Sequence, residues 1–209
     1  MRVHTRYLVE VVEAFNFCPF AEGARKTAAL ERRVILDEDP LAAALAAVDE
    51  FEPLARVAVA ILIFPRHTAG ADDFERFVGE LRDADGKRRA RKHGPFAFAP
   101  FHPDAPWGSE SPERLVMFLR RSPDPSVQLV RFSALDAVRS PAPGGKFLFD
   151  GSAAGMAELE RRAQAVPISE KIARDNFATV EKNGIEKIQA VLRDIKEDRA
   201  RTYARFGLK

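Results

Sequence analysis

The feature of the sequence that most constrains the fold is the apolar run Val57-Ala-Val-Ala-Ile-Leu-Ile-Phe64, which Pro65 follows directly. Apolar and β-branched residues without polar alternation are typical of a strand buried on both faces. Proline cannot donate a backbone hydrogen bond to a sheet, so the strand is expected to end at Pro65. The run is too short to span a bilayer, which takes about 20 residues. A strand buried on both faces needs covering layers, and the chain therefore predicts a sheet covered by helices.

Helical and extended patterns alternate around this strand. Asp39-Pro40 is a helix cap followed by a proline in the first helical position. Apolar residues then recur at helical spacing from Ala71 to about Asp85, where Asp85-Gly86 is expected to end the helix. The other predicted elements are helices at 5–15 and from Pro19 to about Lys26, strands at 32–36 and 96–101, a strand or extended segment at 115–119, a short helix after Ser122 that the prolines favour over a strand, a loop at 140–145, and helices at 152–166, 169–183 and from 185 toward 203.

These patterns together predict an α/β (α+β) fold. Its sheet would be small, mostly antiparallel or mixed, with three to four strands covered by helices, and a ferredoxin-like arrangement is one option. We expect residues 1–150 to form the core and residues 151–209 a helical C-terminal extension packed on it as a single structural unit. A chain of 209 residues is long enough to bury a core without disulfides or metals.

Charge and composition exclude several classes of protein. The 33 basic and 31 acidic residues give a net charge of +2, whereas nucleic-acid-binding domains usually show a segregated basic excess. Nucleic acid is therefore not an expected partner, and we interpret the basic run Lys87–Lys92 as a solvated helix end or loop. The single cysteine excludes an internal disulfide and a multi-cysteine metal site. The sequence shows no signal peptide, so the expected location is the cytoplasm.

The only cysteine is the first candidate for chemistry, in Asn16-Phe17-Cys18-Pro19-Phe20-Ala21. If Pro19 opens a helix, Cys18 caps it, and the positive end of the helix dipole would lower the thiol pKa. Arg25 would add positive potential. A thiolate of this kind serves as a nucleophile, a redox group or a metal ligand. The alternative is a structural cysteine packed between two phenylalanines.

A second candidate group follows the predicted strand 96–101. Pro103 keeps His102 extended at the strand end, where Asp104 would orient its ring as the acid–base partner of Cys18. The alternative is a turn in which His102 bonds to local backbone. Trp107 follows and would form an aromatic wall.

Arginines make up the third group, in Arg120-Arg121 and at Arg131. They border apolar residues on a segment expected to face the core, where an isolated charge is costly. Arg121 and Arg131 would hold a carboxylate or phosphate in bidentate fashion. The alternative is a salt-bridged surface with Asp124 and Asp136 as partners.

Three segments resemble, in the same order, a bacterial family catalogued as domain of unknown function 1415. They are Asn16–Ala21, Phe101–Asp104 and Arg121–Arg131, and the family counterparts read N-L-C-P-F-A, S-F-H-P-D and N-R-S-P-Y-P-x-x-H-L-L-R. The chain departs from the third motif at Arg120, Asp124 and Gln128, where the family has Asn, Tyr and His. The resemblance covers roughly residues 5–140. It implies Cys18, His102, Asp104, Arg121 and Arg131 as site residues, without implying a reaction.

These residues lead to one principal hypothesis and two alternatives. We expect an uncharacterised bacterial enzyme acting on a small anionic molecule, with Cys18, His102 and Asp104 in one pocket and Arg25, Trp107, Arg121 and Arg131 around the substrate. The first alternative is a haem- or metal-binding protein with Cys18 or His102 as ligand. The second is an interaction module whose charged C-terminal helix pairs with a partner or with itself in a homodimer. The sequence does not identify a cofactor or a substrate.

Overall fold

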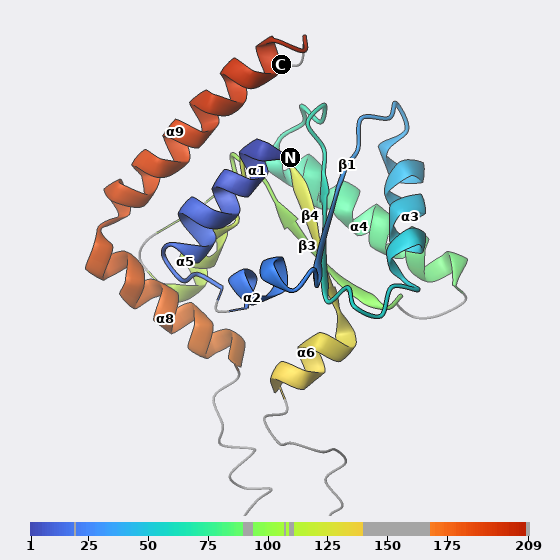
Figure 1. Ribbon diagram of the computed structural model, residues 1–209, viewed down its shortest axis with the longest axis horizontal. Helices are drawn as coiled ribbons and strands as arrows, with labels where there is room; N and C mark the ends of the chain where they lie inside the picture. Colours follow the sequence, from blue (N-terminus) through green and yellow to red (C-terminus); the bar gives the residue numbers. More distant parts are fainter. Residues whose placement is uncertain (19, 90–93, 107, 109–110, 140–167, 208–209) are drawn as a thin grey trace, which may run out of the picture.

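The computed structural model describes residues 1–18, 20–89, 94–106, 108, 111–139 and 168–207. Helices and strands alternate through most of the chain (Figure 1). The elements are α1 (Arg2–Arg6), a π-helical continuation η1 (Tyr7–Glu13), α2 (Ala21–Lys26), β1 (Leu30–Val34), α3 (Pro40–Phe51), β2 (Val59–Ile63), α4 (Ala71–Arg88), β3 (Phe96–Phe101), α5 (Pro112–Leu119), β4 (Ser126–Arg131), α6 (Phe132–Arg139), α8 (Ile168–Asn183) and α9 (Ile185–Ala204).

The strands form one mixed sheet in the order β1-β2-β4-β3. β1 pairs with β2 in parallel, and β4 runs antiparallel to both of its neighbours. The predicted α/β fold with a mixed four-stranded sheet is therefore confirmed. The ferredoxin-like option is not the arrangement found, because a helix separates every two consecutive strands here, whereas two strands follow each other directly in that motif.

Two hydrophobic clusters cover the two faces of the sheet, because successive side chains of a strand point to opposite faces. On β2, Ala60 and Leu62 belong to the cluster under α3 and α4, whereas Ile61 and Ile63 belong to the cluster under α1, η1, α5, α8 and α9. Figure 1 shows α3 and α4 on one side of the sheet and α1, α5, α8 and α9 on the other. The buried run 57–64 thus lies in the centre of a three-layered structure, as its composition predicts.

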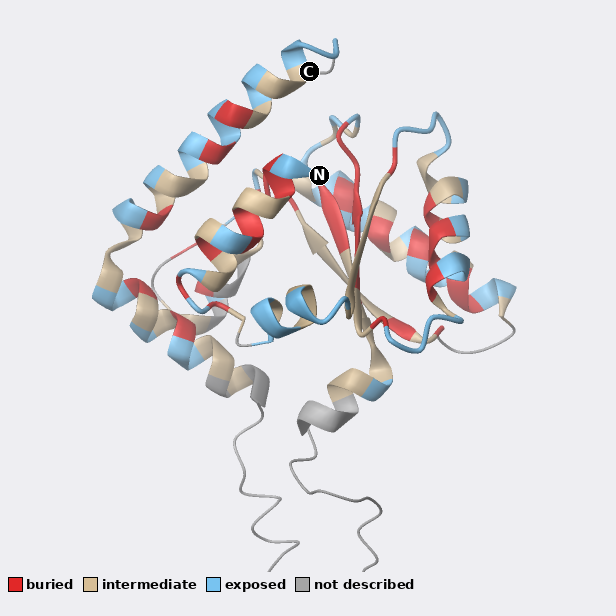
Figure 2. Cartoon of the chain, in the orientation of Figure 1, coloured by how far each residue is buried: buried red, intermediate tan, exposed pale blue. Residues whose placement is uncertain are grey.

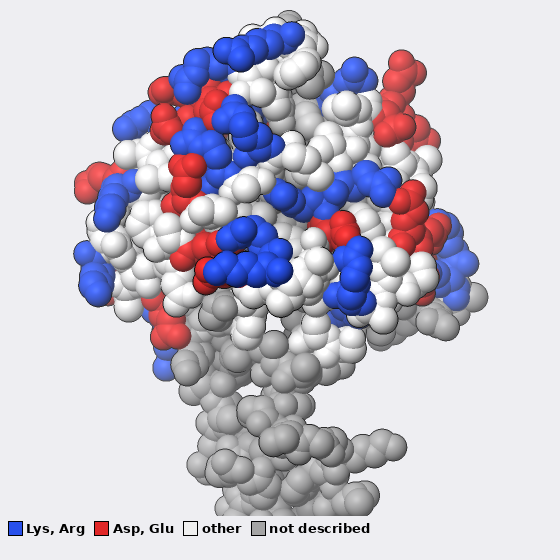
Figure 3. All heavy atoms as spheres, viewed as in Figure 1, with Lys and Arg blue, Asp and Glu red and all other residues white. Residues whose placement is uncertain are grey.

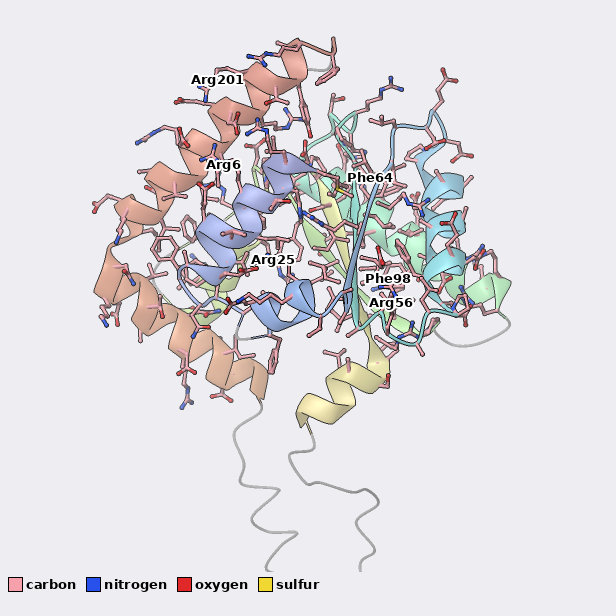
Figure 4. All side chains as sticks on the ribbon, in the orientation of Figure 1. Arg6, Arg25, Arg56, Phe64, Phe98 and Arg201 are labelled. Carbon is pink, nitrogen blue, oxygen red and sulfur yellow. The ribbon has the colours of Figure 1, made fainter. Side chains whose placement is uncertain are left out.

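The C-terminal helices α8 and α9 pack on the core. Gly184 separates them with a φ of +79°, a conformation that glycine adopts without strain. Ile188 and Ile195 of α9 are buried, and the outer face of this helix is exposed (Figure 2). Asp198 of α9 pairs with Arg2 and Arg6 of α1, and Figure 4 shows Arg6 between α1 and α9.

Three sequence-based assignments in the core are wrong. The segment 115–119 belongs to helix α5, because an apolar run of this length does not distinguish a strand from a helix. The segment after Ser122 forms β4, where Val127 and Leu129 alternate with polar Gln128 to give the period of a strand. Helix α4 continues past Asp85-Gly86 to Arg88.

Other boundaries agree with the prediction. The Asp39 carboxylate accepts a hydrogen bond from the Ala42 backbone N–H at 3.0 Å and caps α3, with Pro40 in its first turn. Lys87 and Arg88 end α4, as expected if the basic run is a helix end, but Arg89 is 13% exposed and paired with Asp85 instead of solvated. Residues 90–92 of the run lie outside the described ranges. The predicted loop at 140–145 and helix at 152–166 also lie outside them.

The described residues also show how apolar the helices are and how charge is distributed over the surface. None of the helices in the described ranges is long and apolar enough to cross a membrane. Basic and acidic side chains are interspersed over the face drawn in Figure 3, as the nearly balanced charge of the chain suggests.

Candidate functional site

A cavity of about 400 Å³ lies between the sheet and the helices α1, η1, α2 and α8. The sheet contributes Val59 and Ile61 of β2 and Gln128 of β4, which point to the same face because Ile61 and Gln128 are opposite each other in the register. Most of the remaining lining is apolar. The polar side chains on its wall come from separate elements and include His4, Cys18, Arg120, Gln128 and Asn176.

Cys18 lies on the wall of this cavity, in the turn between η1 and α2. Asn16 begins the turn with a φ of +52°, a left-handed conformation that asparagine tolerates better than most residues. The cap of α2 is Phe20, not Cys18, so the predicted capping role of the thiol is wrong. Pro19 lies outside the described ranges.

The thiol of Cys18 is partly buried, and this burial raises its pKa. Hydrogen bonds with the backbone of Phe20 and Ala21 act in the opposite direction but are the smaller effect. The backbone N–H groups at the helix start therefore lower the thiol pKa, as the sequence suggested, but the effect of desolvation, which raises the pKa, is larger. Cys18 is a protonated thiol near neutral pH instead of the expected stabilised thiolate.

We expect Cys18 to be a slow target for alkylation. Because its pKa is raised, the thiolate fraction near neutral pH is smaller than that of a free cysteine, and the native protein should react with iodoacetamide at least several-fold more slowly than the same chain unfolded in guanidinium. Since the chain has one cysteine, the mass increase per molecule measures this site alone. Native and unfolded rates that agree from neutral to alkaline pH would contradict the burial of the thiol.

His4 is a deeply buried polar residue on the cavity wall, with 3% of its surface exposed. Its Nδ1 atom has no hydrogen-bond partner within the described part of the chain. Burial, together with the positive charges of Arg32 and the N-terminus, lowers the pKa of His4 to about 3. The ring is therefore neutral at physiological pH, and a buried ring nitrogen without a partner leaves its desolvation uncompensated.

Arg120 supplies the positive charge of the cavity. Burial lowers the pKa of its guanidinium, and Glu75 opposes this effect through space. No hydrogen bond or ion pair to the Arg120 side chain is present among the described residues. The arginine pair in the sequence was a signal for this residue, but the motif resemblance favoured its neighbour Arg121 as the anion ligand.

Helix α8 closes the cavity from the C-terminal part of the chain. Ile172, Ala173 and Asn176 line the wall, and the Asn176 side-chain amide donates a hydrogen bond to the Phe17 carbonyl at 3.1 Å. Asn176 thus fixes the segment next to Cys18. The sequence did not indicate that α8 belongs to the site, because no local pattern shows which side chains of an amphipathic helix line a cavity.

His102 does not line the cavity with Cys18. Its ring packs on Phe74 of α4, on the opposite face of the sheet, with the ring centroids 5.9 Å apart. Nδ1 accepts from the Asp104 backbone N–H at 3.1 Å, and Nε2 lies 3.1 Å from the Ala69 carbonyl. The Asp104 carboxylate does not orient the ring and lies 3.4 Å from Lys196 instead. The predicted pocket containing Cys18, His102 and Asp104 together is therefore not formed, and His102 holds local backbone.

The other predicted substrate residues also lie away from this cavity. Arg25 forms a two-point ion pair with Glu13, at 2.7 and 2.8 Å, which joins α2 to η1 (Figure 4). Arg121 lines a second cavity, and Arg131 bonds to backbone carbonyls of the segment that follows α3. The indole of Trp107 lies outside the described residues.

The fold and the cavity define the class of protein: a mixed α/β fold with a largely apolar cavity between its sheet and its N- and C-terminal helices. The chain belongs to the family whose model is described as "Protein of unknown function (DUF1415)", which matches residues 2–146. Helices α8 and α9 lie beyond this match, although α8 completes the cavity. None of the curated proteins and none of the solved structures compared with the chain matches it.

Proposed function

We propose that the cavity binds a small molecule with an apolar body and one anionic group. The observation that carries this proposal is Arg120, a partly buried cation on the wall of an otherwise largely apolar cavity, without an ion-pair partner among the described residues. The volume of about 400 Å³ lies in the range of small-molecule sites. Apolar walls with a few polar groups that fix orientation are the usual composition of such sites.

The polar groups suggest how the molecule is oriented. Its anionic group would lie at Arg120, because an arginine fork bonds a carboxylate or sulfonate through two N–H groups. Its body would contact Val59, Ile61 and the α8 residue Ala173. His4 and Gln128 offer neutral hydrogen-bonding groups on the same wall.

Chemistry at Cys18 is the second candidate function, because the thiol lines the same cavity. With its pKa raised, the thiol would need deprotonation by the substrate, because the pKa of His4 on the same wall is lowered to about 3 and this ring is a weak base. A haem protein would use Cys18 as ligand in this arrangement, since both ring nitrogens of His102 face backbone partners. A Soret band that disappears in Cys18→Ala would support that alternative.

The interaction-module alternative has less support from the geometry of α9. The apolar residues Ile188 and Ile195, which would mediate pairing with another chain, are buried in the protein's own core. Ion pairs from Arg2 and Arg6 to Asp198 hold the same helix on α1.

Two fluorescent probes with one aromatic skeleton test the proposed ligand class. Anilinonaphthalene sulfonate carries an anionic group that the neutral N-phenylnaphthylamine lacks. We expect the sulfonate to bind the native protein at one site and Arg120→Gln to weaken it about tenfold or more, because a hydrogen bond to a charged group is lost. The affinity for the neutral probe should stay within about twofold.

Two control variants separate the effect of the Arg120 charge from the effect of the cavity volume. Arg82→Gln removes an exposed arginine of α4 and should leave both affinities unchanged. Ala173→Phe fills the cavity from α8 and should weaken both probes. Equal affinities of the two probes for the native protein, or equal loss of both in Arg120→Gln, would overturn the proposed anion selectivity.

A further inference from the structure

A second cavity, of about 260 Å³, lies where two loops of the core meet α9. The first loop follows β3 and contributes Pro103, and the second follows α5 and contributes Arg121–Pro123. Helix α9 forms the opposite wall, which includes Leu192, Arg193 and Lys196. This cavity shares no lining residue with the larger one, so a ligand site here is independent of the proposed function.

Three cationic side chains converge on this small space: Arg121, Arg193 and Lys196. Within the described ranges, no carboxylate forms an ion pair with Arg121 or Arg193. Asp104 approaches Lys196 at 3.4 Å, but both side chains are about two-thirds exposed, at 65% and 66%, and such a pair is weak. The buried carboxylate of Asp124 is already bonded to Arg199 and Tyr203. The cavity therefore keeps an excess of positive charge.

Arg121 is held in place before any ligand arrives. Its Nε donates to the Pro103 carbonyl at 3.0 Å, which fixes the plane of the guanidinium at the cavity wall. No hydrogen bond uses its two Nη groups among the residues that the structure describes. A fixed guanidinium loses little conformational freedom when it binds an oxyanion, and its fork matches two oxygens of a phosphate.

We propose that this second cavity binds a phosphate group. Three cations around one small space suit a dianion better than a single carboxylate, and the two arginines offer paired N–H donors to its oxygens. The volume exceeds that of a phosphate ion and leaves room against Leu192 and Pro123 for a small organic part. The ligand is therefore inorganic phosphate or a small phosphomonoester.

The test monitors the backbone amide signals of the full chain by NMR during titration with inorganic phosphate or phenyl phosphate at constant ionic strength. We expect saturable shifts at the amides of Asp104, of residues 121–122 and of residues 189–196, because Pro103 and Pro123 carry no amide hydrogen. Arg193→Gln and Lys196→Gln should each weaken binding about fivefold or more. Tighter binding of phenyl phosphate identifies the monoester as the ligand class, and equal binding identifies the free ion.

The matched control is Arg201→Gln, which removes an exposed arginine of the same helix, paired with Glu197 at 3.8 Å. Its affinity for both probes should equal that of the unmodified chain. Arg121→Gln should give the largest loss, and the two α9 variants keep the test valid if that variant folds poorly. Shifts that sodium chloride reproduces at the same ionic strength, or an equal loss in Arg201→Gln, would refute the site.

Discussion

Asp124→Asn is expected to lower the free energy of unfolding by about 3 kcal/mol, because it removes one partner of a buried charge pair. Asp124 is 1% exposed, and its carboxylate accepts from Arg199 Nε at 2.6 Å and from the Tyr203 hydroxyl at 2.8 Å. Burial and the nearby Asp124 charge raise the pKa of Tyr203, which keeps its hydroxyl a donor. The substitution removes the carboxylate charge that faces the guanidinium of Arg199, which is 18% exposed. Urea unfolding, followed by far-ultraviolet circular dichroism, measures the loss.

Two variants separate the buried pair from ordinary surface charge. Asp194→Asn removes an ion pair from α9 to Arg6 whose acidic side chain is 58% exposed, and it should cost about 1 kcal/mol or less. Arg199→Met combined with Asp124→Asn should be less destabilising than the sum of the two single changes, because both changes remove the same ion pair. Equal losses for Asp124→Asn and Asp194→Asn would mean that the buried network does not hold α9 on the core.

Arg131→Met should destabilise the protein by about 2–4 kcal/mol, since hydrogen bonds to charged groups are worth about 1.5–3 kcal/mol each and are not additive. Arg131 Nε donates to the Val57 carbonyl at 2.8 Å, and Nη2 lies 3.1–3.2 Å from the carbonyls of Phe51, Glu52 and Leu54. The guanidinium also stacks over Phe96, 4.6 Å from the ring centroid. Arg131 therefore fastens the end of α3 to the sheet, and thermal or urea unfolding gives the loss.

Arg131→Lys should recover only part of this loss, because a single ammonium group cannot reproduce the planar fork. Arg33→Gln is the control, since its ion pair with Glu50 is exposed and should contribute about 1 kcal/mol or less. At temperatures where Arg131→Met is folded, its affinity for anilinonaphthalene sulfonate should equal that of the unmodified chain. A weakened affinity there would restore the anion-binding role that the sequence suggested for Arg131.

The candidate site could be predicted only in part from the sequence. Cys18 was identified as a candidate and does line the larger cavity, but the sign of its pKa shift was wrong because burial depends on residues distant in the sequence. His102 follows a strand whose alternate side chains face opposite layers: Phe101 lines the cavity, whereas His102 packs under α4. His4 shows no metal-ligand spacing in the sequence, and its buried environment forms only when α1 packs on the sheet.

The sequence by itself determined the elements whose signals are local. The run 57–64 defines a buried strand, Asp39 and Pro40 start α3, and Gly184 separates the last two helices, because composition, capping and backbone conformation act within a few residues. Only the tertiary structure decided that 126–131 is a central strand between β2 and β3, that α8 closes a cavity beside Cys18, and that the Arg120 side chain forms no ion pair or hydrogen bond among the described residues. These features depend on contacts between distant segments and on the cost of removing charge from water, and neither is encoded in any short stretch of the chain.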